Sequence, residues 1–314
     1  MIEKYTNFKR AIFLSWYCSK GDCKFCYMST QKDLIKDPNK AKRSLESIFA
    51  EAIITKACGW EIEFLSGGYD SYTTDELSFI LKTIKKITGK KQWLNIGNLK
   101  KEELSKFKPY LEGFTGAVEC VNPGLQEKVC PSKPLGPIID TFNICDFLDI
   151  KKGMTIIIGL GESIEDFKNL KIFIEKHGID RITFYSLNPQ RGTPYTKSPE
   201  VDYYASWIKK ARQEFPDIEI IAGAWRDKTH YFSKLLEAGA DYFTKFPAIK
   251  YFGSYEAKEV EKEIRKADRK FLGTFTIMPK IDLEKELSNL EVSDDMRKRI
   301  IIKVEEYLKT MNRD

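Results

Sequence analysis

The sequence has little of what several common classes of protein need. Its 314 residues include only two histidines, His177 and His230, both far in sequence from the N-terminal cysteines. No apolar run approaches the roughly 18 residues that a transmembrane helix requires. The first residues lack the hydrophobic region of a signal peptide. We therefore expect a soluble protein that does not enter a membrane, with no histidine near enough in sequence to help the cysteines bind zinc.

The charge and the cysteines narrow the class further. The formal net charge of +6 is modest and is spread over lysine and glutamate pairs along the chain. Such a pattern favours solubility and does not indicate a nucleic-acid-binding patch. The seven cysteines come without a secretory signal, so we expect free thiols in a reducing cytoplasm.

Three of these cysteines, Cys18, Cys23 and Cys26, lie within nine residues of each other, directly after the apolar run 11–14. That run is typical of a buried strand, which places the thiols on the loop that leaves it. Three thiolates on one loop can hold three irons of a 4Fe–4S cluster and leave the fourth open to an outside ligand. An open iron indicates a reaction site, because an electron-transfer ferredoxin normally closes all four positions. The alternatives are inert core thiols and a zinc site, although zinc requires a fourth ligand.

The spacing C-x4-C-x2-C resembles the signature of the radical S-adenosylmethionine enzymes, with one residue more than usual between the first two cysteines. The resemblance implies that S-adenosylmethionine binds the open iron and that Phe25 packs against its adenine. It also implies cleavage to methionine and a 5′-deoxyadenosyl radical by one electron, from a donor such as ferredoxin or flavodoxin.

The rest of the chain alternates between apolar runs and amphipathic stretches. With the strand before Cys18 there are eight runs, at 11–14, 62–65, 93–96, 114–118, 155–158, 182–185, 218–222 and 242–246. Most are separated by a helical pattern, which predicts an α/β fold with a parallel sheet. We expect a complete or partial (β/α)8 barrel over residues 1–254, with its function at the carboxyl ends of the strands. Residues 255–314 are predicted to form a helical C-terminal extension packed on the barrel.

The loop after the second strand contains Gly67, Gly68 and Tyr69. Two glycines allow a ligand to approach the backbone closely, although a glycine pair also suits an ordinary turn. In the family that the cysteines resemble, this pair receives the methionine amino group, and tyrosine often follows it in biotin-synthase-like members. A side chain at Gly68 is therefore expected to obstruct S-adenosylmethionine without removing iron.

Later loops extend the resemblance to biotin-synthase-like enzymes. Gly159, Gly161 and Glu162 form a Gly-Leu-Gly-Glu segment like the one that packs near the adenine in that group. The resemblance also implies cofactor or substrate contacts from other strand-end loops. These contacts are assigned to Glu119 and Asn122 at the ribose, Asn188 near the cofactor, and Arg226 reaching into the barrel. A solvated turn or an exposed, salt-bridged arginine is the alternative at these positions.

The remaining cysteines bear on the reaction. Cys58 and Cys145 have apolar neighbours typical of core packing, whereas Cys120 and Cys130 flank one strand-end loop and are candidates for an auxiliary iron–sulfur cluster. The first hypothesis is therefore sulfur insertion into a small-molecule or carrier-protein-bound substrate, as in lipoyl or biotin biosynthesis. The second is carbon-skeleton chemistry in cofactor biosynthesis, such as that of a hydrogenase cofactor. A non-catalytic iron–sulfur scaffold or electron carrier is the alternative outside enzymes.

Overall fold

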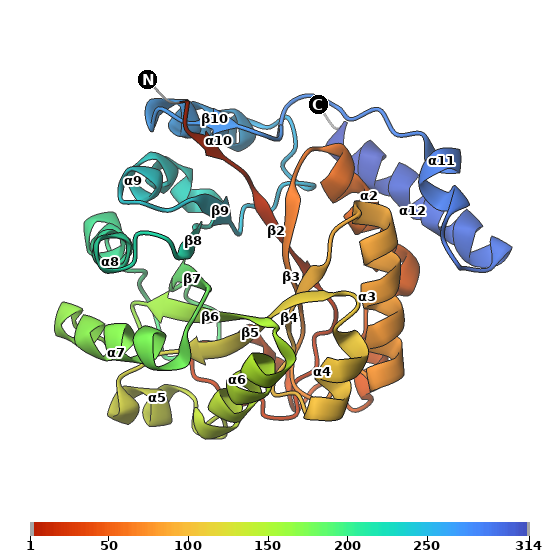
Figure 1. The fold of residues 1–314 in the computed structure, drawn as a ribbon. Helices are drawn as coiled ribbons and strands as arrows, with labels where there is room; N and C mark the ends of the chain where they lie inside the picture. Colours follow the sequence, from red (N-terminus) through yellow and green to blue (C-terminus); the bar gives the residue numbers. More distant parts are fainter. Residues whose placement is uncertain (1–2, 313–314) are drawn as a thin grey trace.

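The computed structural model of the protein describes residues 3–312. Eight parallel strands form one sheet, and their order in the sheet follows the sequence. Figure 1 shows these strands in the centre with the helices outside them. The strands are β2 (Lys9–Phe13), β3 (Glu61–Ser66), β4 (Gln92–Asn95), β5 (Leu111–Glu119), β6 (Lys151–Ile158), β7 (Arg181–Ser186), β8 (Glu219–Gly223) and β9 (Tyr242–Thr244).

The outer layer consists of helices that connect the strands. These are α1 (Tyr27–Gln31), α2 (Leu45–Ala57), α3 (Thr74–Thr88), α4 (Lys101–Phe107), α5 (Pro123–Val129), α6 (Gly136–Leu148), α7 (Phe167–His177), α8 (Val201–Glu214) and α9 (Phe232–Glu237). Three short 3-10 helices join them, η1 (Pro38–Ala41), η2 (Ile164–Asp166) and η3 (Arg226–Tyr231). Two of these helices, α5 and α6, follow one strand, where the sequence pattern had predicted no helix.

Helix α3 shows why the sequence forms these elements where it does. Thr73 and Glu76 make a reciprocal capping box at its start, and Gly89 ends it in the left-handed conformation. Leucine and isoleucine recur with helical spacing between these caps, so one face is apolar. That face is buried against the barrel, through Leu77, Ile80, Leu81, Ile84 and Ile87.

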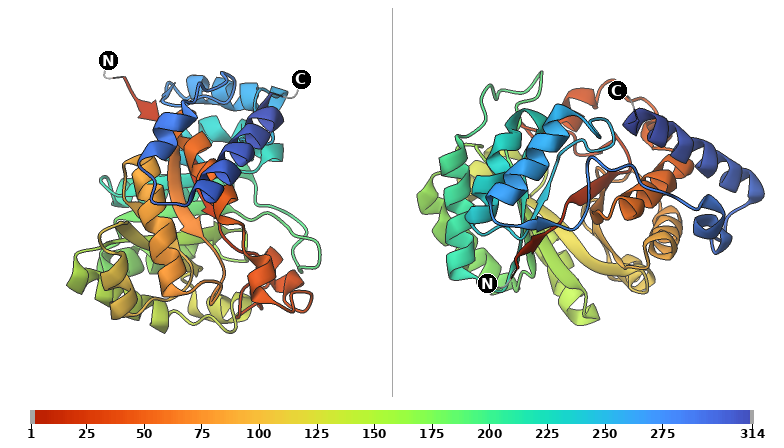
Figure 2. Two further views of the ribbon diagram at one scale, coloured as in Figure 1. Left: turned by 90° about the vertical axis from the view of Figure 1, so that its right-hand side faces the viewer. Right: turned by 90° about the horizontal axis from the view of Figure 1, so that it is seen from above.

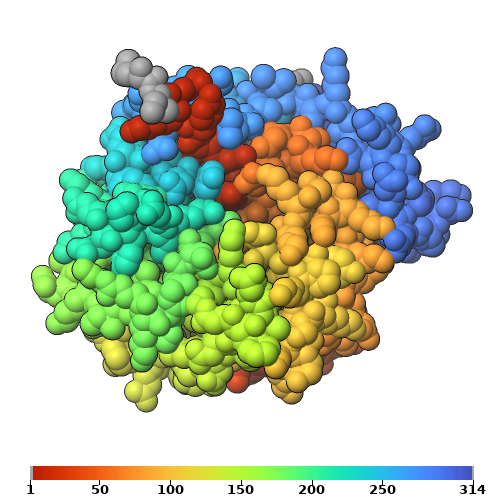
Figure 3. All heavy atoms as spheres, viewed as in Figure 1, coloured from red at the N-terminus to blue at the C-terminus, as the bar shows by residue number. Residues whose placement is uncertain are grey.

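The sheet nearly closes into a barrel. Its first and last strands meet at a parallel bridge between Phe8 and Phe243, where the Phe243 amide donates to the Asn7 carbonyl at 3.3 Å. In Figure 3 successive segments of the chain follow one another around the molecule, as this strand order requires. The predicted α/β barrel is therefore confirmed.

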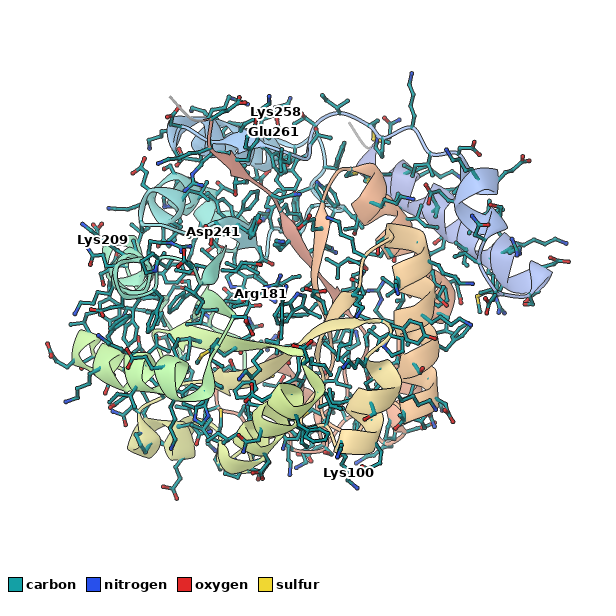
Figure 4. The ribbon with its side chains drawn as sticks, in the orientation of Figure 1. Lys100, Arg181, Lys209, Asp241, Lys258 and Glu261 are labelled. Carbon is teal, nitrogen blue, oxygen red and sulfur yellow. The ribbon has the colours of Figure 1, made fainter. Side chains whose placement is uncertain are left out.

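Charged and aromatic side chains pack together at the amino end of the barrel. Arg181, the first residue of β7, points into the ring of strands in Figure 4. Its guanidinium lies 3.8 Å from the centre of the Trp93 ring, and Nη2 pairs with the Glu219 carboxylate at 2.8 Å. Nη1 donates to the backbone carbonyl of Glu63 at 3.2 Å.

The tail contains α10 (Tyr255–Lys266), α11 (Leu283–Ser288) and α12 (Asp294–Met311). Helix α12 packs against α2, as Figure 2 shows. A two-stranded sheet that the sequence pattern did not indicate joins β1 (Tyr5–Thr6) to β10 (Lys270–Phe271). The division of the chain at residue 254 stays a prediction. Within residues 3–312, no helix has both the length and the apolar character needed to cross a bilayer.

Candidate active site

A cavity of about 1120 Å³ opens at the carboxyl ends of the barrel strands. The last residues of five strands line it, Phe13, Ser66, Asn95, Glu119 and Ser186. Functional groups of (β/α)8 enzymes come from these strand ends and the loops that follow. The cavity therefore lies where the sequence predicted the function.

The three N-terminal cysteines lie on the loop between β2 and α1, and all three line this cavity as free, partly exposed thiols. Two backbone hydrogen bonds fix the loop. The Cys26 amide donates to the Cys23 carbonyl at 3.1 Å, and the Lys24 amide donates to the Val129 carbonyl at the end of α5 at 2.8 Å. Cys18, Cys23 and Cys26 therefore share a short segment that is anchored to a neighbouring helix.

The loop after β3 lies directly against the cysteine loop. A Cβ at Gly68 would overlap the Tyr17 carbonyl oxygen and lie 2.5 Å from the Cβ of Cys18, so this close approach requires glycine. The Ser19 amide donates to the Tyr69 carbonyl at 3.2 Å, which ties the two loops together. Gly68 thus positions the first cysteine, a role that its place in the sequence did not reveal.

The other two residues of this loop, Gly67 and Tyr69, also line the cavity. The Tyr69 hydroxyl donates to Asn98 Oδ1 at 3.2 Å. Burial raises the pKa of Tyr69 to about 12, so the phenol is neutral at physiological pH. Tyr69 therefore offers a ring face and a neutral hydroxyl to the cavity.

A buried ion pair forms another part of the wall. Lys133 Nζ donates to Glu119 Oε1 at 3.1 Å, and the Thr155 hydroxyl donates to Oε2 at 3.0 Å. Burial opposes the charge of Lys133, but Glu119 and the nearby Cys23 outweigh it and raise the pKa of Lys133 above its usual value. The Glu119 carboxylate is thus already paired. Sequence reasoning missed Lys133 as its partner, because this lysine lies in an irregular segment without a periodic signal.

The Gly-Leu-Gly-Glu segment folds around its own carboxylate. Gly159 and Gly161 have φ of +109° and +120°, which only glycine adopts readily. Their amides and that of Leu160 point at Glu162, whose two carboxylate oxygens accept from all three at 2.7–3.1 Å. Glu162 therefore braces the loop that follows β6.

Glu162→Ala is expected to lower the free energy of unfolding by about 2 kcal/mol, because three backbone N–H groups lose their acceptor. A urea titration with the matched variant Glu165→Ala checks this. Glu165 is exposed and lies three residues farther along the chain, in η2. Equal unfolding midpoints for the two variants would show that the brace contributes nothing.

Known proteins can be compared with this chain. It is 42% identical over 319 aligned residues to an uncharacterized protein of Methanocaldococcus jannaschii. The alignment covers 96% of this chain and 88% of that protein. Biotin synthase of Thermotoga neapolitana is 27% identical over 191 residues, or 58% of this chain and 66% of the synthase. No protein-family model matches the chain.

Solved structures share the fold. Methylornithine synthase has a TM-score of 0.66 at 18% identity, over 76% of this chain and 72% of its own. SuiB of Streptococcus suis has a TM-score of 0.50 at 13% identity, over 74% of this chain and 51% of its own. On its sequence similarity to biotin synthases, the chain belongs to the radical S-adenosylmethionine superfamily. It is a biotin-synthase-like member, which confirms the resemblance read from the cysteine loop and makes the protein a member of a superfamily of enzymes.

Of the other residues predicted to contact the cofactor, some line the cavity and some lie outside it. Phe25 and Asn188 line the cavity. Asn122 instead caps α5, where its side chain accepts from the Leu125 amide at 3.1 Å and donates to Asp166 at 2.8 Å. Among the described residues that line the cavity, neither Asn122 nor the Gly-Leu-Gly-Glu segment appears.

Arg226 lies outside the described lining as well. Nη1 pairs with the Glu256 carboxylate of α10 at 3.2 Å, and the guanidinium lies 4.6 Å from the centre of the Tyr251 ring. This is the exposed, salt-bridged arrangement that the sequence left open. A role for Arg226 in substrate binding stays a prediction and requires its side chain to leave Glu256.

Cys120 and Cys130 are buried together in a small apolar cluster that also contacts Cys23 and Phe25. Burial raises the pKa of Cys120 to about 11. A hydrogen bond to Cys23 raises the pKa of Cys130 and lowers that of Cys23, because the Cys130 thiol donates to it. Cys130 therefore lies beside the cysteine loop.

The residues present fit the 4Fe–4S cluster of a radical S-adenosylmethionine enzyme. Each thiolate of such a cluster binds a different iron, so its cysteines stand apart around the cluster. In residues 3–312, no three Cys, His, Asp or Glu side chains converge as the ligands of one metal ion do. Three free thiols on one short loop at the cavity are the kind of donor set that a 4Fe–4S cluster takes.

Proposed function

We propose that the protein cleaves S-adenosylmethionine reductively and abstracts a hydrogen atom from an unactivated carbon of its substrate. The observation that supports this is the shared cavity of Cys18, Cys23 and Cys26 with Gly67, Gly68 and Tyr69. When bound to the three thiolates, a 4Fe–4S cluster supplies the electron that breaks the sulfonium and leaves a 5′-deoxyadenosyl radical. An external donor such as ferredoxin or flavodoxin provides that electron, in a reducing cytoplasm that keeps the thiols free.

The residues of the chain position the loops of the cavity and exclude water from the reaction. Gly68 lets the β3 loop approach Cys18, and Glu162 holds the loop after β6 in its left-handed turns. Phe25 and Tyr69 contribute aromatic faces to the cavity, where they keep water from a reactive radical. Each of these tasks needs rigid support, which the barrel strands supply.

Anaerobic reconstitution tests the proposal. About four irons and four sulfides per chain indicate one cluster, and about eight of each indicate two. With S-adenosylmethionine and dithionite, the reconstituted protein is expected to release methionine and 5′-deoxyadenosine. An iron–sulfur scaffold or electron carrier would hold iron yet neither bind nor cleave S-adenosylmethionine, and that result would overturn the proposal.

The outcome of the radical reaction depends on the second cysteine pair. Sulfur insertion, the first hypothesis from the sequence, requires a sulfur donor on the substrate side of the cavity. Cys120 and Cys130 are buried in an apolar cluster, and Cys130 contacts Cys23. This position favours the second candidate, radical carbon-skeleton chemistry in cofactor biosynthesis, because a sulfur donor beside the first cluster would lie away from the substrate.

The double variant Cys120→Ala/Cys130→Ala separates these candidates. We expect it to retain four irons per chain, S-adenosylmethionine cleavage and full product formation, because two buried thiols without further ligands do not hold a second cluster. Iron analysis and mass spectrometry of the products check this. Loss of a second cluster together with every thiolated product would restore sulfur insertion to first place.

A further inference from the structure

Lys245 directly follows β9 and lines the cavity beside Phe64, Tyr185 and Trp225. Its backbone has φ of +75°, a left-handed conformation that few non-glycine residues adopt. Thr244 and Phe246 on either side are fully buried, so the chain holds this conformation firmly. Strained residues of this kind persist where the surrounding structure enforces them, and they concentrate at functional sites.

The ammonium group of Lys245 has aromatic neighbours and no acidic partner. Nζ lies 4.5 Å from the centre of the Tyr185 ring and 5.8 Å from that of Phe64. Across residues 3–312, no carboxylate lies within salt-bridge distance of it, and it donates no hydrogen bond. Lys133, a buried lysine of the same cavity, is by contrast paired with Glu119 at 3.1 Å.

Glu63, the acid whose charge acts most strongly on Lys245, accepts hydrogen bonds from two neutral hydroxyls and makes no ion pair with the ammonium. The Tyr185 hydroxyl donates to Glu63 Oε1 at 2.5 Å, and the Thr244 hydroxyl donates to Oε2 at 2.6 Å. Burial lowers the pKa of Lys245, although Glu63 and Glu119 oppose this from a distance and Arg10 adds to it. The aromatic surroundings also strengthen any charge interaction that the lysine makes.

A cation that lies among aromatic rings and touches no acid is only partly hydrated, and a bound anion offsets that loss. We infer that the Lys245 ammonium binds a carboxylate or phosphate group of the substrate at the inner end of the cavity. This inference rests on the proposed function, since it places the reacting carbon between Lys245 and the cysteine loop. Gly223 leaves room chiefly for the Tyr185 ring, which a Cβ there would overlap, and the same Cβ would lie 3.2 Å from Lys245 Cγ. The substrate class is therefore a small acid or phosphate ester.

Calorimetric titration of the reconstituted holoprotein, saturated with S-adenosylmethionine, tests this inference with acetate and inorganic phosphate as probes. We expect one of the two anions to bind the wild type, and Lys245→Met to bind it at least tenfold more weakly. Lys40→Met is the matched control, since Lys40 is an exposed lysine at the same cavity and should bind as the wild type does. The anion that binds distinguishes a carboxylate site from a phosphate site.

Other results would overturn the inference. These are equal binding by Lys245→Met and wild type, absence of binding of both anions to wild type, and loss of S-adenosylmethionine affinity in Lys245→Met. If that variant does not fold, acetic anhydride labelling of Lys245 in wild type decides, because a bound anion must protect it. A wild type that binds the anion but does not cleave S-adenosylmethionine would retain the anion site and refute the proposed function.

Discussion

Alanine at Cys18, Cys23 or Cys26 is expected to abolish both the 4Fe–4S absorbance and all formation of 5′-deoxyadenosine. The loop contains no other cysteine, and each thiolate would bind a different iron, so no neighbour on the loop can replace a missing ligand. The measurements are iron content, visible absorbance and chromatography of the products after reduction with dithionite. Activity is expected to fall below detection, because without the cluster no electron reaches the sulfonium.

The controls are Cys58→Ala and Cys145→Ala. Both thiols are buried in the core and neither is among the residues that line the cavity, so neither is expected to bind the iron of the cluster. The Cys23→Ala variant needs a further comparison, because Cys130 lies against Cys23 and offers a replacement thiol. If Cys23→Ala keeps a cluster and Cys23→Ala/Cys130→Ala loses it, Cys130 is able to serve as a ligand. Cleavage of S-adenosylmethionine by that double variant would refute the assignment.

The barrel could be predicted because its signals are local. Each barrel strand is a short apolar run followed by a connection, and helices such as α3 carry their own caps and apolar face. The small sheet of β1 and β10 was not predictable in this way. It pairs Tyr5 with Lys270, residues from opposite ends of the chain, and two-residue strands leave no pattern.

The site was predictable only where a motif carried it. The cysteines and Gly67–Tyr69 occupy one cavity because consecutive loops of a barrel meet at one end. Side-chain direction was not predictable from spacing. Asn122 caps its own helix and Glu162 binds its own loop, since short-range backbone donors compete with any ligand for these side chains. Lys245 carries no motif, and only the fold reveals its position in the cavity.

Gly68→Val is expected to weaken S-adenosylmethionine binding by more than tenfold, about 1.4 kcal/mol or more, and also to reduce the iron content. The sequence predicted only the first effect. A Cβ at this position would overlap the Tyr17 carbonyl and lie 2.5 Å from the Cβ of Cys18. Rotation of a side chain cannot relieve contacts with backbone, so the cysteine loop itself must move. Displacement of Cys18 then removes a ligand from its place at the cluster.

Gly67→Ala is the matched control, one residue earlier on the same loop. Its Cβ would meet the Ser71 hydroxyl at 3.2 Å and otherwise only ordinary van der Waals neighbours, so a small side-chain shift accommodates it. We expect wild-type iron content in Gly67→Ala and a clear loss in Gly68→Val and Gly68→Ala, measured after identical reconstitution. Wild-type iron content and wild-type S-adenosylmethionine affinity in the Gly68 variants would show that this glycine does not position the cysteine loop. Loss of affinity with full iron content would instead place Gly68 at the methionine end of the cofactor, as the sequence alone predicted.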